Sequence, residues 1–276
     1  MSWVVSGTYK GAAVSDADAQ AYLRAVEAAD NQGPLEQGVQ QAVNQFVIGC
    51  KADGIWTAIK ASCILAGART LAGALVPLAG TAPTNPFVNP ANESLGRLFV
   101  SGDYNRKTGL LGNGSTKYLN SNRNNNADPQ NSKHTSVYIS TVGSASAGEA
   151  LLGSWAASGK IPVQMLNVDA SLRNLRINDA AGSLSPRNTS TGIWGLSRSA
   201  SATVTERFGG ANYSSSTASS APSADIIYVF ARNTDLGIIN HYSGRLSFYS
   251  IGESLDLALL DARVTTLINA IAAAIP

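Results

Sequence analysis

Residues 226–271, IIYVFARNTDLGIINHYSGRLSFYSIGESLDLALLDARVTTLINAI, decide the fold class of this chain. Residues 226–231 are almost wholly apolar and rich in β-branched and aromatic side chains, which predicts a central strand buried on both faces. Residues 246–251 alternate instead, which directs Leu246 and Phe248 to one face and their neighbours to the other. The stretch therefore predicts the closing strands of a β-sandwich.

A helix of about five turns follows these strands, because the apolar period changes from two to about 3.6 near Ser254. Ser254 is the expected N-cap, with Glu253 and Asp256 as favourable charges at the positive end of the helix. The apolar stripe consists of Leu260, Val264, Leu267, Ile268 and Ile271. Such a stripe needs cover, either from the sandwich or from helices near the N-terminus. The second option would join both ends of the chain in one helical base.

The composition suits an all-β protein with many turns, because 276 residues include 26 Gly and only 14% charged side chains. The net charge of +2 argues against nucleic-acid binding, which needs clustered Lys and Arg. We find no run of about 18 apolar residues, so no membrane span is predicted. The first residues lack a basic region followed by an apolar core, so we expect no secretory signal and folding in a cytoplasm.

The N-terminal part reads as a short strand or arm followed by helices, and we predict an arm and helical module over residues 1–76. One helix starts near Ser15, which with Asp18 three residues on approximates a capping box. A second helix covers residues 35–49, and a third is expected over residues 55–65. The module would serve either as an assembly anchor or as a cap over one end of the sandwich. A Pro/Asn-rich linker is predicted over residues 77–96.

The two cysteines, Cys50 and Cys63, lie in this helix-like part among small and apolar residues. A disulfide between packed helices is one reading, but a reducing compartment favours two free thiols. Their spacing, with no His nearby, does not provide the four ligands that zinc requires.

The predicted sandwich covers residues 97–252, and the C-terminal helix covers residues 253–276. Residues 109–119 predict two strands joined by an Asn-Gly turn, and residues 120–133, which are almost wholly polar, predict an exposed loop. Turn residues at intervals of about ten then separate short strands, as a sandwich or jelly roll requires. These strands are expected at residues 137–142, 150–155, 163–168, 172–177, 192–197 and 201–208.

Catalytic chemistry is sparse in the sequence. His134 and His241 are the two histidines, and both stand beside polar turn residues, which predicts surface or loop positions. No motif of a nucleophile elbow, a zinc protease or a phosphate-binding loop occurs. Glu253 and Asp256 fall at a helix start and not on one strand, as paired glycosidase carboxylates would. We therefore expect no enzyme, no cofactor and no metal site.

Sugar binding is the remaining candidate, because sugar sites pair an aromatic platform with amide and charged side chains. The candidate glycan-binding residues are Trp155, Trp194, Tyr213, Asn124, Asn125 and Asn126. The alternative for each tryptophan is core filling, and for the asparagines it is a plain solvated connection.

Three blocks of the sequence carry a resemblance to known proteins. They are DYNRKTGL and GNGSTKYL at residues 103–119, RLSFYSIG and LDLALLDAR at residues 245–263, and CKADGIW at residues 50–56. They resemble phage and prophage structural proteins of the concanavalin A-like (laminin G-like) lectin/glucanase group. The resemblance implies a jelly-roll sandwich in a virion component. It carries over no catalytic residue, because the glucanase carboxylate pattern is missing, and no calcium ligands.

The sequence thus predicts a mainly β protein with helical additions, namely a concanavalin A-like jelly-roll sandwich with an N-terminal helical module and a C-terminal helix. The expected function is that of a non-enzymatic virion structural protein, a tail-fibre or baseplate component that contacts host surface glycans. A head decoration (cement) protein that stabilises the capsid is the alternative, and a polysaccharide-degrading enzyme is the third reading. The expected partners are other virion proteins, copies of the chain itself in a trimer, and host polysaccharide. Assembly would take place in the host cytoplasm.

Overall fold

The structure is a computed structural model that describes residues 14–86, 98–144, 148–155, 163–167, 172–179, 181–186 and 190–276. The predicted arm at residues 1–11 and residues 87–96 of the predicted linker lie outside this described part.

Two large sheets form the body of the molecule. Sheet A has the strand order β12–β11–β10–β5–β16–β3–β2, and β1 pairs with β16 as well. Its strands are β1 (Ile59–Ile64), β2 (Tyr104–Asn105), β3 (Gly109–Leu111), β5 (Lys133–Thr141), β10 (Gly192–Ala200), β11 (Thr203–Phe208), β12 (Ala211–Ser215) and β16 (Arg245–Gly252). All of its pairings are antiparallel.

Sheet B has the order β15–β14–β6–β7–β8–β9, and β13 pairs with both β4 and β6. Its strands are β4 (Leu119–Asn124), β6 (Ala150–Trp155), β7 (Val163–Asn167), β8 (Leu172–Ile177), β9 (Ser183–Pro186), β13 (Ile226–Val229), β14 (Arg232–Thr234) and β15 (Gly237–Ile239). Only the β14–β6 pairing is parallel among the described strands. Because β13 has a partner on each side, the predicted central position of this strand is confirmed, although Ile226 and Tyr228 are half-buried rather than buried.

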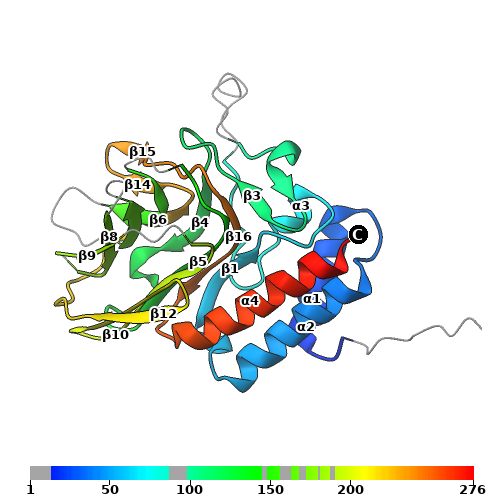
Figure 1. Cartoon of the computed structure of the whole chain (residues 1–276), viewed down its shortest axis with the longest axis horizontal. Helices are drawn as coiled ribbons and strands as arrows, with labels where there is room; N and C mark the ends of the chain where they lie inside the picture. The colour runs from blue at the N-terminus through cyan, green and yellow to red at the C-terminus, as the bar shows by residue number, and fades with distance from the viewer. Residues whose placement is uncertain are drawn as a thin grey trace, which may run out of the picture.

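The two sheets pack face to face as a β-sandwich, and helices lie against the outer face of sheet A (Figure 1). The core between the sheets takes Val137, Ile139, Leu196 and Tyr249 from sheet A and Leu152, Met165, Leu175 and Ile227 from sheet B. The helices are α1 (Ala17–Asp30), α2 (Gln37–Ala52), α3 (Leu71–Ala74) and α4 (Leu257–Ala274), with short 3-10 turns η1 (Trp56–Ala58), η3 (Ser101–Asp103) and η4 (Asn125–Ala127). The predicted fold class, a mainly β sandwich with helices near both ends of the chain, is confirmed.

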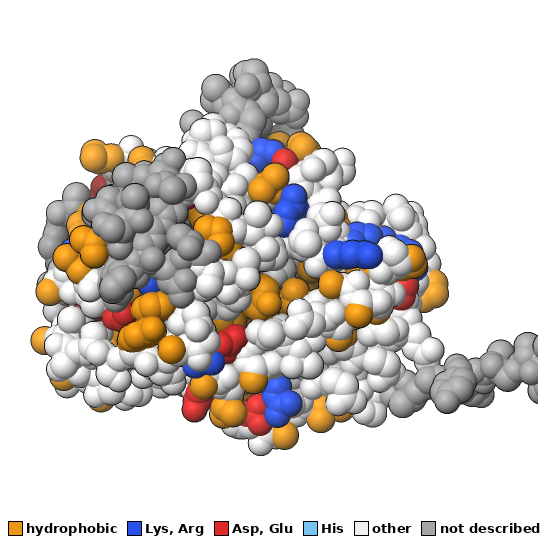
Figure 2. Space-filling view, in the orientation of Figure 1, with side chains coloured by type: hydrophobic (Ala, Val, Ile, Leu, Met, Phe, Trp, Pro, Cys, Tyr) orange, Lys and Arg blue, Asp and Glu red, His pale blue; other side chains and the backbone are white. Residues whose placement is uncertain are grey.

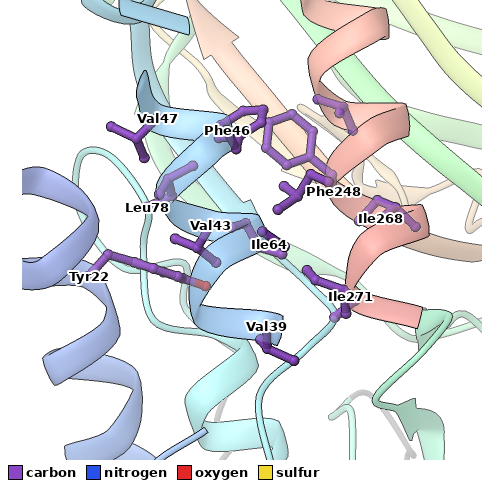
Figure 3. Close-up of a cluster of buried hydrophobic side chains, with 14 of the residues drawn as sticks. Tyr22, Val39, Val43, Phe46, Val47, Ile64, Leu78, Phe248, Ile268 and Ile271 are labelled. Atoms are coloured by element: carbon purple, nitrogen blue, oxygen red, sulfur yellow. The ribbon is translucent and has the colours of Figure 1, made fainter. Parts of the chain in front are cut away.

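A second core joins the helices to sheet A (Figure 3). Phe46 of α2 meets Phe248 of β16 edge-on, with ring centroids 5.9 Å apart, and both side chains are buried. Ile271 of α4 and Tyr22 of α1 pack into the same cluster. Burying apolar surface on both faces of sheet A stabilises the helical layer and the sandwich together.

Helix α4 lies alongside α2 in Figure 1, where the red and blue ribbons run side by side. The predicted stripe is buried, and it packs against α2 and also against strands of sheet A. Both of the expected ways of covering it therefore occur. Its 18 residues, with a mean hydropathy of 1.5, are long and apolar enough to cross a membrane by length and composition alone, a test that core helices also pass.

The predicted helix at residues 55–65 is wrong. Residues 56–58 form the turn η1, and residues 59–64 form β1, which pairs with β16 of sheet A. Ile59, Cys63 and Ile64 are buried because one face of the strand meets the helices and the other meets the sandwich core. A short apolar run buried on both faces has no period that separates strand from helix. Cys63 and Cys50 are both free thiols.

Strand β16 does not alternate as its sequence predicts. A register shift between Leu246 and Phe248 inserts a β-bulge, so Leu246 joins the core between the sheets while Phe248 joins the helical core. Tyr249 then returns to the core between the sheets. The predicted common face of Leu246 and Phe248 is therefore wrong, because the bulge changes the side to which the side chains point.

Residues 109–133 also differ from expectation. Strand β3 belongs to sheet A and β4 to sheet B, so the Asn-Gly turn connects the two sheets and makes no hairpin. The predicted exposed loop at residues 120–133 contains β4 and η4. An ion network replaces apolar burial here. Asp128 pairs with Arg123 and with Lys133, whose Nζ also donates to the carbonyl of Asn125 at 2.8 Å.

Two helix caps differ by one or two residues from the prediction. Asp16, not Ser15, caps α1, and Asp256, not Ser254, caps α4 by accepting from the N–H groups of Ala258 and Leu259. The hydroxyl of Ser254 instead lies 3.0 Å from that of Ser132. A carboxylate is as good a cap as a hydroxyl, so neighbouring candidates cannot be ranked from sequence.

Candidate functional site

The six residues predicted to bind glycans lie in three separate places. Trp155 ends β6 in sheet B, Trp194 and Tyr213 belong to β10 and β12 of sheet A, and Asn124–Asn126 span the end of β4 and η4. The structure does not bring these three groups together into one surface.

Trp194 and Tyr213 belong to an aromatic cluster at the β12 edge of the sandwich. Tyr213 stacks on Phe208 with centroids 4.3 Å apart, and the buried Arg173 places its guanidinium 4.0 Å from the Trp194 ring and 3.9 Å from the Phe208 ring. Trp194 is only 4% exposed, whereas Tyr213 is 47% exposed. The core-filling alternative thus describes Trp194, and the exposed ring of Tyr213 covers the edge of the cluster.

The asparagine stretch also divides into buried and exposed side chains. Asn124 and Asn126 are exposed, but Asn125 is fully buried in η4, where its backbone N–H donates to the carbonyl of Asp225 at 2.8 Å. Asn125 therefore has a structural position that a ligand on the surface would not reach.

A polar cleft at one end of the sandwich is the strongest candidate site in the described part of the chain. It consists of two hollows of about 540 and 250 Å³ that share His241 as a common wall. The larger hollow is lined by Asn113, Gly114, Ser144, Gly148, Glu149, Asn240, His241 and Ser243. The smaller is lined by Ser115, Thr116, Tyr118, Gly237, Ile238 and His241. We call this site the polar cleft.

Three parts of the chain form most of the polar cleft: residues 112–118 between β3 and β4, the described residues 142–144 and 148–149 before β6, and residues 240–244 before β16. The first and third segments are bound together. Gly112 N donates to the carbonyl of Gly244 at 2.9 Å, and Gly114 N donates to that of Tyr242 at 3.2 Å. A Cβ at Gly112 would lie 2.0 Å from the Tyr242 oxygen, so the backbones can approach this closely only at glycine.

Asn113 shapes the first segment. Its Oδ1 accepts from the backbone N–H groups of Ser115, Thr116 and Lys117 at 2.9–3.1 Å, and its amide nitrogen donates to the Thr116 hydroxyl. These bonds fix the turn as an asparagine side chain commonly does. Polar side chains of the turn are therefore held at the rim of the cleft.

Glu149 connects the second and third segments. Its Oε1 accepts from the backbone N–H of Ser243 at 3.1 Å, from the Ser243 hydroxyl, and from the Ser144 hydroxyl at 3.0 Å. Only 4% of Glu149 is exposed, and its Oε2 and the Oδ1 of Asn240 are buried atoms that accept no hydrogen bond in the described part of the chain. Acceptors of this kind carry a desolvation cost until a donor reaches them.

Aromatic rings form the other wall of the cleft. Tyr118 stacks on Tyr228 with centroids 4.9 Å apart, and His241 meets Tyr118 at 6.3 Å and 64°. His241 is half-buried beside these rings, in agreement with its predicted loop position. The cleft thus presents hydroxyl and amide groups beside a half-exposed imidazole, a set of groups that suits a hydroxylated ligand.

His134, by contrast, is fully buried, so its predicted surface position is wrong. Its Nδ1 lies 2.6 Å from the carbonyl oxygen of Glu253 and its Nε2 lies 2.7 Å from the hydroxyl of Ser250. Since a carbonyl only accepts, Nδ1 carries the proton and Nε2 accepts from Ser250. Burial lowers the pKa of His134 to about 4, which keeps the ring neutral.

Metal ligands do not gather at the cleft or elsewhere in the described residues, since no group of three His, Cys, Asp or Glu side chains occurs there. Glu253 pairs with Lys60 at 2.9 Å, and Asp256 caps α4. Charged side chains of both signs are scattered over the face seen in Figure 2, outside the grey atoms, with no field of one sign.

No protein-family model matches this sequence, and no curated protein resembles it significantly. Solved structures give partial likenesses. The binding domain of botulinum neurotoxin serotype D has 12% identity and a TM-score of 0.43, over 76% of this chain and 51% of that chain. Domain 4 of AbnA, an extracellular arabinanase from Geobacillus stearothermophilus, has 11% identity and a TM-score of 0.38, over 57% of this chain and 75% of that chain.

The NanB sialidase from Streptococcus pneumoniae has 14% identity and a TM-score of 0.37, over 49% of this chain. The match spans only 24% of that sialidase chain. The description of the fold as a β-sandwich rests on the two sheets themselves.

Proposed function

We propose that this protein is a non-enzymatic, concanavalin A-like virion structural protein that contacts surface glycans of the host through the polar cleft. The observation that carries the glycan part is the convergence of hydroxyl, amide and imidazole groups from three chain segments on one cleft of about 540 Å³. Sugars present many hydroxyl groups, each of which donates and accepts, so recognition needs such mixed partners around a cavity.

The virion part of the proposal is supported by the sequence resemblance. Its block GNGSTKYL, residues 112–119, forms the wall of the cleft that includes Asn113 and Tyr118. The block that carries the resemblance and the candidate site therefore coincide in space.

The non-enzymatic part of the proposal is supported by the number and the hydrogen bonding of the carboxylates that line the cleft. Glycoside hydrolysis uses two carboxyl groups, most often about 5–10 Å apart. Glu149 is the one carboxylate among the described residues that line the cleft, and its Oε1 already accepts three hydrogen bonds. This arrangement suits the ordering of two loops better than proton transfer to a substrate.

Binding of the purified protein to an array of bacterial surface polysaccharides and to whole host cells tests the proposal. We expect a signal for a limited set of glycans, and we expect His241→Ala to remove it. Asn126→Ala, an exposed site outside the cleft, is the matched control and should bind as the unmodified protein does. Blank arrays and blank cell pull-downs would contradict the glycan part. Loss of binding in Asn126→Ala alone would place the site in the asparagine stretch instead.

A further inference from the structure

Two buried acceptor atoms in the wall of the polar cleft have no donor. They are Oε2 of Glu149 and Oδ1 of Asn240, and both residues line the larger hollow. Neither atom accepts a hydrogen bond in the part of the chain that the structure describes. Burying a polar group without a partner costs free energy, and the cost is larger when the group is charged. A ligand that brings donors into this hollow would therefore remove part of that cost.

Glu149 and Asn240 lie side by side in this wall. The backbone N–H of Ala150, the residue after Glu149, donates to the carbonyl of Asn240 at 2.7 Å. A Cβ at Gly148, the residue before Glu149, would lie 2.9 Å from the amide nitrogen of Asn240. The segment that carries Glu149 thus runs beside Asn240, and the missing side chain of Gly148 lets the two segments come this close.

The negative charge of Glu149 has no counter-ion in the cleft. No ion pair among the described residues includes Glu149, and the described residues that line the two hollows include no lysine or arginine. Its Oε1 accepts from neutral groups only, namely the backbone N–H of Ser243 and the hydroxyls of Ser243 and Ser144. The whole chain has a formal net charge of +2, so the negative character of the cleft is local. Such a site favours a positively charged ligand.

An ammonium group fits this hollow better than a metal ion does. Calcium takes about six to eight oxygen ligands, usually with several carboxylates among them, whereas Glu149 is the one carboxylate among the described residues that line the hollow. An ammonium group carries a single positive charge and has several N–H donors. It can therefore supply a donor to Glu149 and another to Asn240 and still bond a hydroxyl group.

We propose that the polar cleft selects glycans that carry a free, protonated amino group, with the ammonium in the larger hollow beside Glu149 and Asn240. The hydroxyl groups of the same sugar then meet other polar side chains of the hollow, such as Asn113 and Ser144. This inference rests on the function proposed above, because it names the class of sugar that the cleft binds.

Titration calorimetry with two oligosaccharides of equal length tests the proposal. One is a glucosamine oligomer with free amino groups, and the other is its N-acetylated counterpart, which has the same linkage but no charge. At pH 7 and constant ionic strength, we expect the unmodified protein to bind the glucosamine oligomer about tenfold or more tightly, as one charge-assisted contact predicts. In Glu149→Gln this ratio of affinities should fall to about one, because the amide is neutral. The ratio cancels a change in cleft shape that affects both oligomers alike.

Asp18→Asn is the matched control, because it makes the same change of net charge at an exposed position of α1 in the helical layer. It should keep the ratio of the unmodified protein. Asn240→Asp is a second variant, which adds a negative charge to the hollow and should raise the affinity for the glucosamine oligomer. Aspartate tolerates the φ of 60° that Asn240 adopts. Near-ultraviolet circular dichroism checks that each variant is folded.

Equal affinity of the unmodified protein for the two oligomers would overturn the proposal. An equal fall of the ratio in Glu149→Gln and Asp18→Asn would do the same. Displacement of the glucosamine oligomer by calcium chloride at constant ionic strength would show a general cation site instead. If the cleft binds neutral glycans, and His241→Ala abolishes that binding without any preference for the amine, the proposed function stands while this inference fails. Absence of binding to any glycan would remove both.

Discussion

The carboxylate of Glu149 accepts hydrogen bonds from both the backbone N–H and the hydroxyl of Ser243, a residue 94 positions further along the chain. This contact fixes the segment before β6 to the segment before β16, and the two together form most of the larger hollow of the polar cleft. The shape of the cleft thus depends on one buried side chain that a ligand need not touch.

Replacing Glu149 should loosen the cleft. We expect Glu149→Ala to lower the free energy of unfolding by about 2 kcal/mol, because the Ser243 and Ser144 donors lose a charged acceptor. Glu149→Gln keeps one acceptor oxygen in place and should lower the free energy of unfolding clearly less than Glu149→Ala does. Urea denaturation of both variants measures the difference, and an equal loss in the two would contradict the assigned role of Oε1.

The contact between Phe46 and Phe248 should hold the helical layer on sheet A. Phe248→Ala should lower the free energy of unfolding by about 3–5 kcal/mol, since it removes a fully buried ring from the junction of α2 and β16. Leu259 of α4 is 37% exposed, and its replacement by Ala is the control, with an expected change below about 1 kcal/mol. Thermal or chemical unfolding that finds the two variants equally stable would contradict this packing.

The N-cap of α4 gives a third prediction. Asp256→Ala should destabilise the protein by about 1 kcal/mol, because the N–H groups of Ala258 and Leu259 lose their acceptor. Asp256→Asn, which retains a capping oxygen, should cost less. If Ser254→Ala costs more than Asp256→Ala, the cap lies where the sequence alone places it and not where the structure does.

The buried His134 should make stability depend on pH. Its pKa is about 4 in the folded protein and about 6.5 in the unfolded chain. Between these values the unfolded chain binds a proton that the folded protein does not, so the free energy of unfolding falls as the pH falls from about 6.5 to about 4. The loss from this group should be about 2–3 kcal/mol.

His134→Gln is the variant that isolates this effect. It should be less stable than the unmodified protein at pH 7 but should lose less stability between pH 6.5 and pH 5. The carboxylates whose pKa values are lowered by ion pairs, Asp128 and Glu36 among them, lose their pairs mainly below this window. If the free energy of unfolding falls equally steeply with decreasing pH in both proteins, His134 is not buried in its neutral form.

The sequence predicts the sandwich and its attached helices well, because the relevant signals are local. Strands such as residues 172–177 and 203–208 alternate between buried and half-buried or exposed side chains, and α4 has an apolar stripe of helical period. The strand at residues 59–64 was missed because it is buried on both faces, and a bulge that depends on pairing with distant strands changes the faces of β16. Such effects arise from contacts between segments far apart in the chain.

The sequence gives fewer signals for the polar cleft than for the fold. The sequence directs attention to tryptophans and to a run of asparagines, yet Trp194 and Asn125 are buried. Glu149 is a single carboxylate in a stretch of small residues, with no motif around it. Only its approach to Ser243 makes it notable. The block GNGSTKYL was the one local signal that marked a wall of the cleft.

The affinity of the unmodified protein and of His241→Ala for the same host polysaccharide tests the central claim most directly. His241 belongs to both hollows of the polar cleft, so its removal takes away the wall that they share. We predict a dissociation constant that rises by about tenfold or more in His241→Ala, with unchanged thermal stability and with Asn126→Ala unaffected. A dissociation constant that is the same for His241→Ala and the unmodified protein would contradict the account.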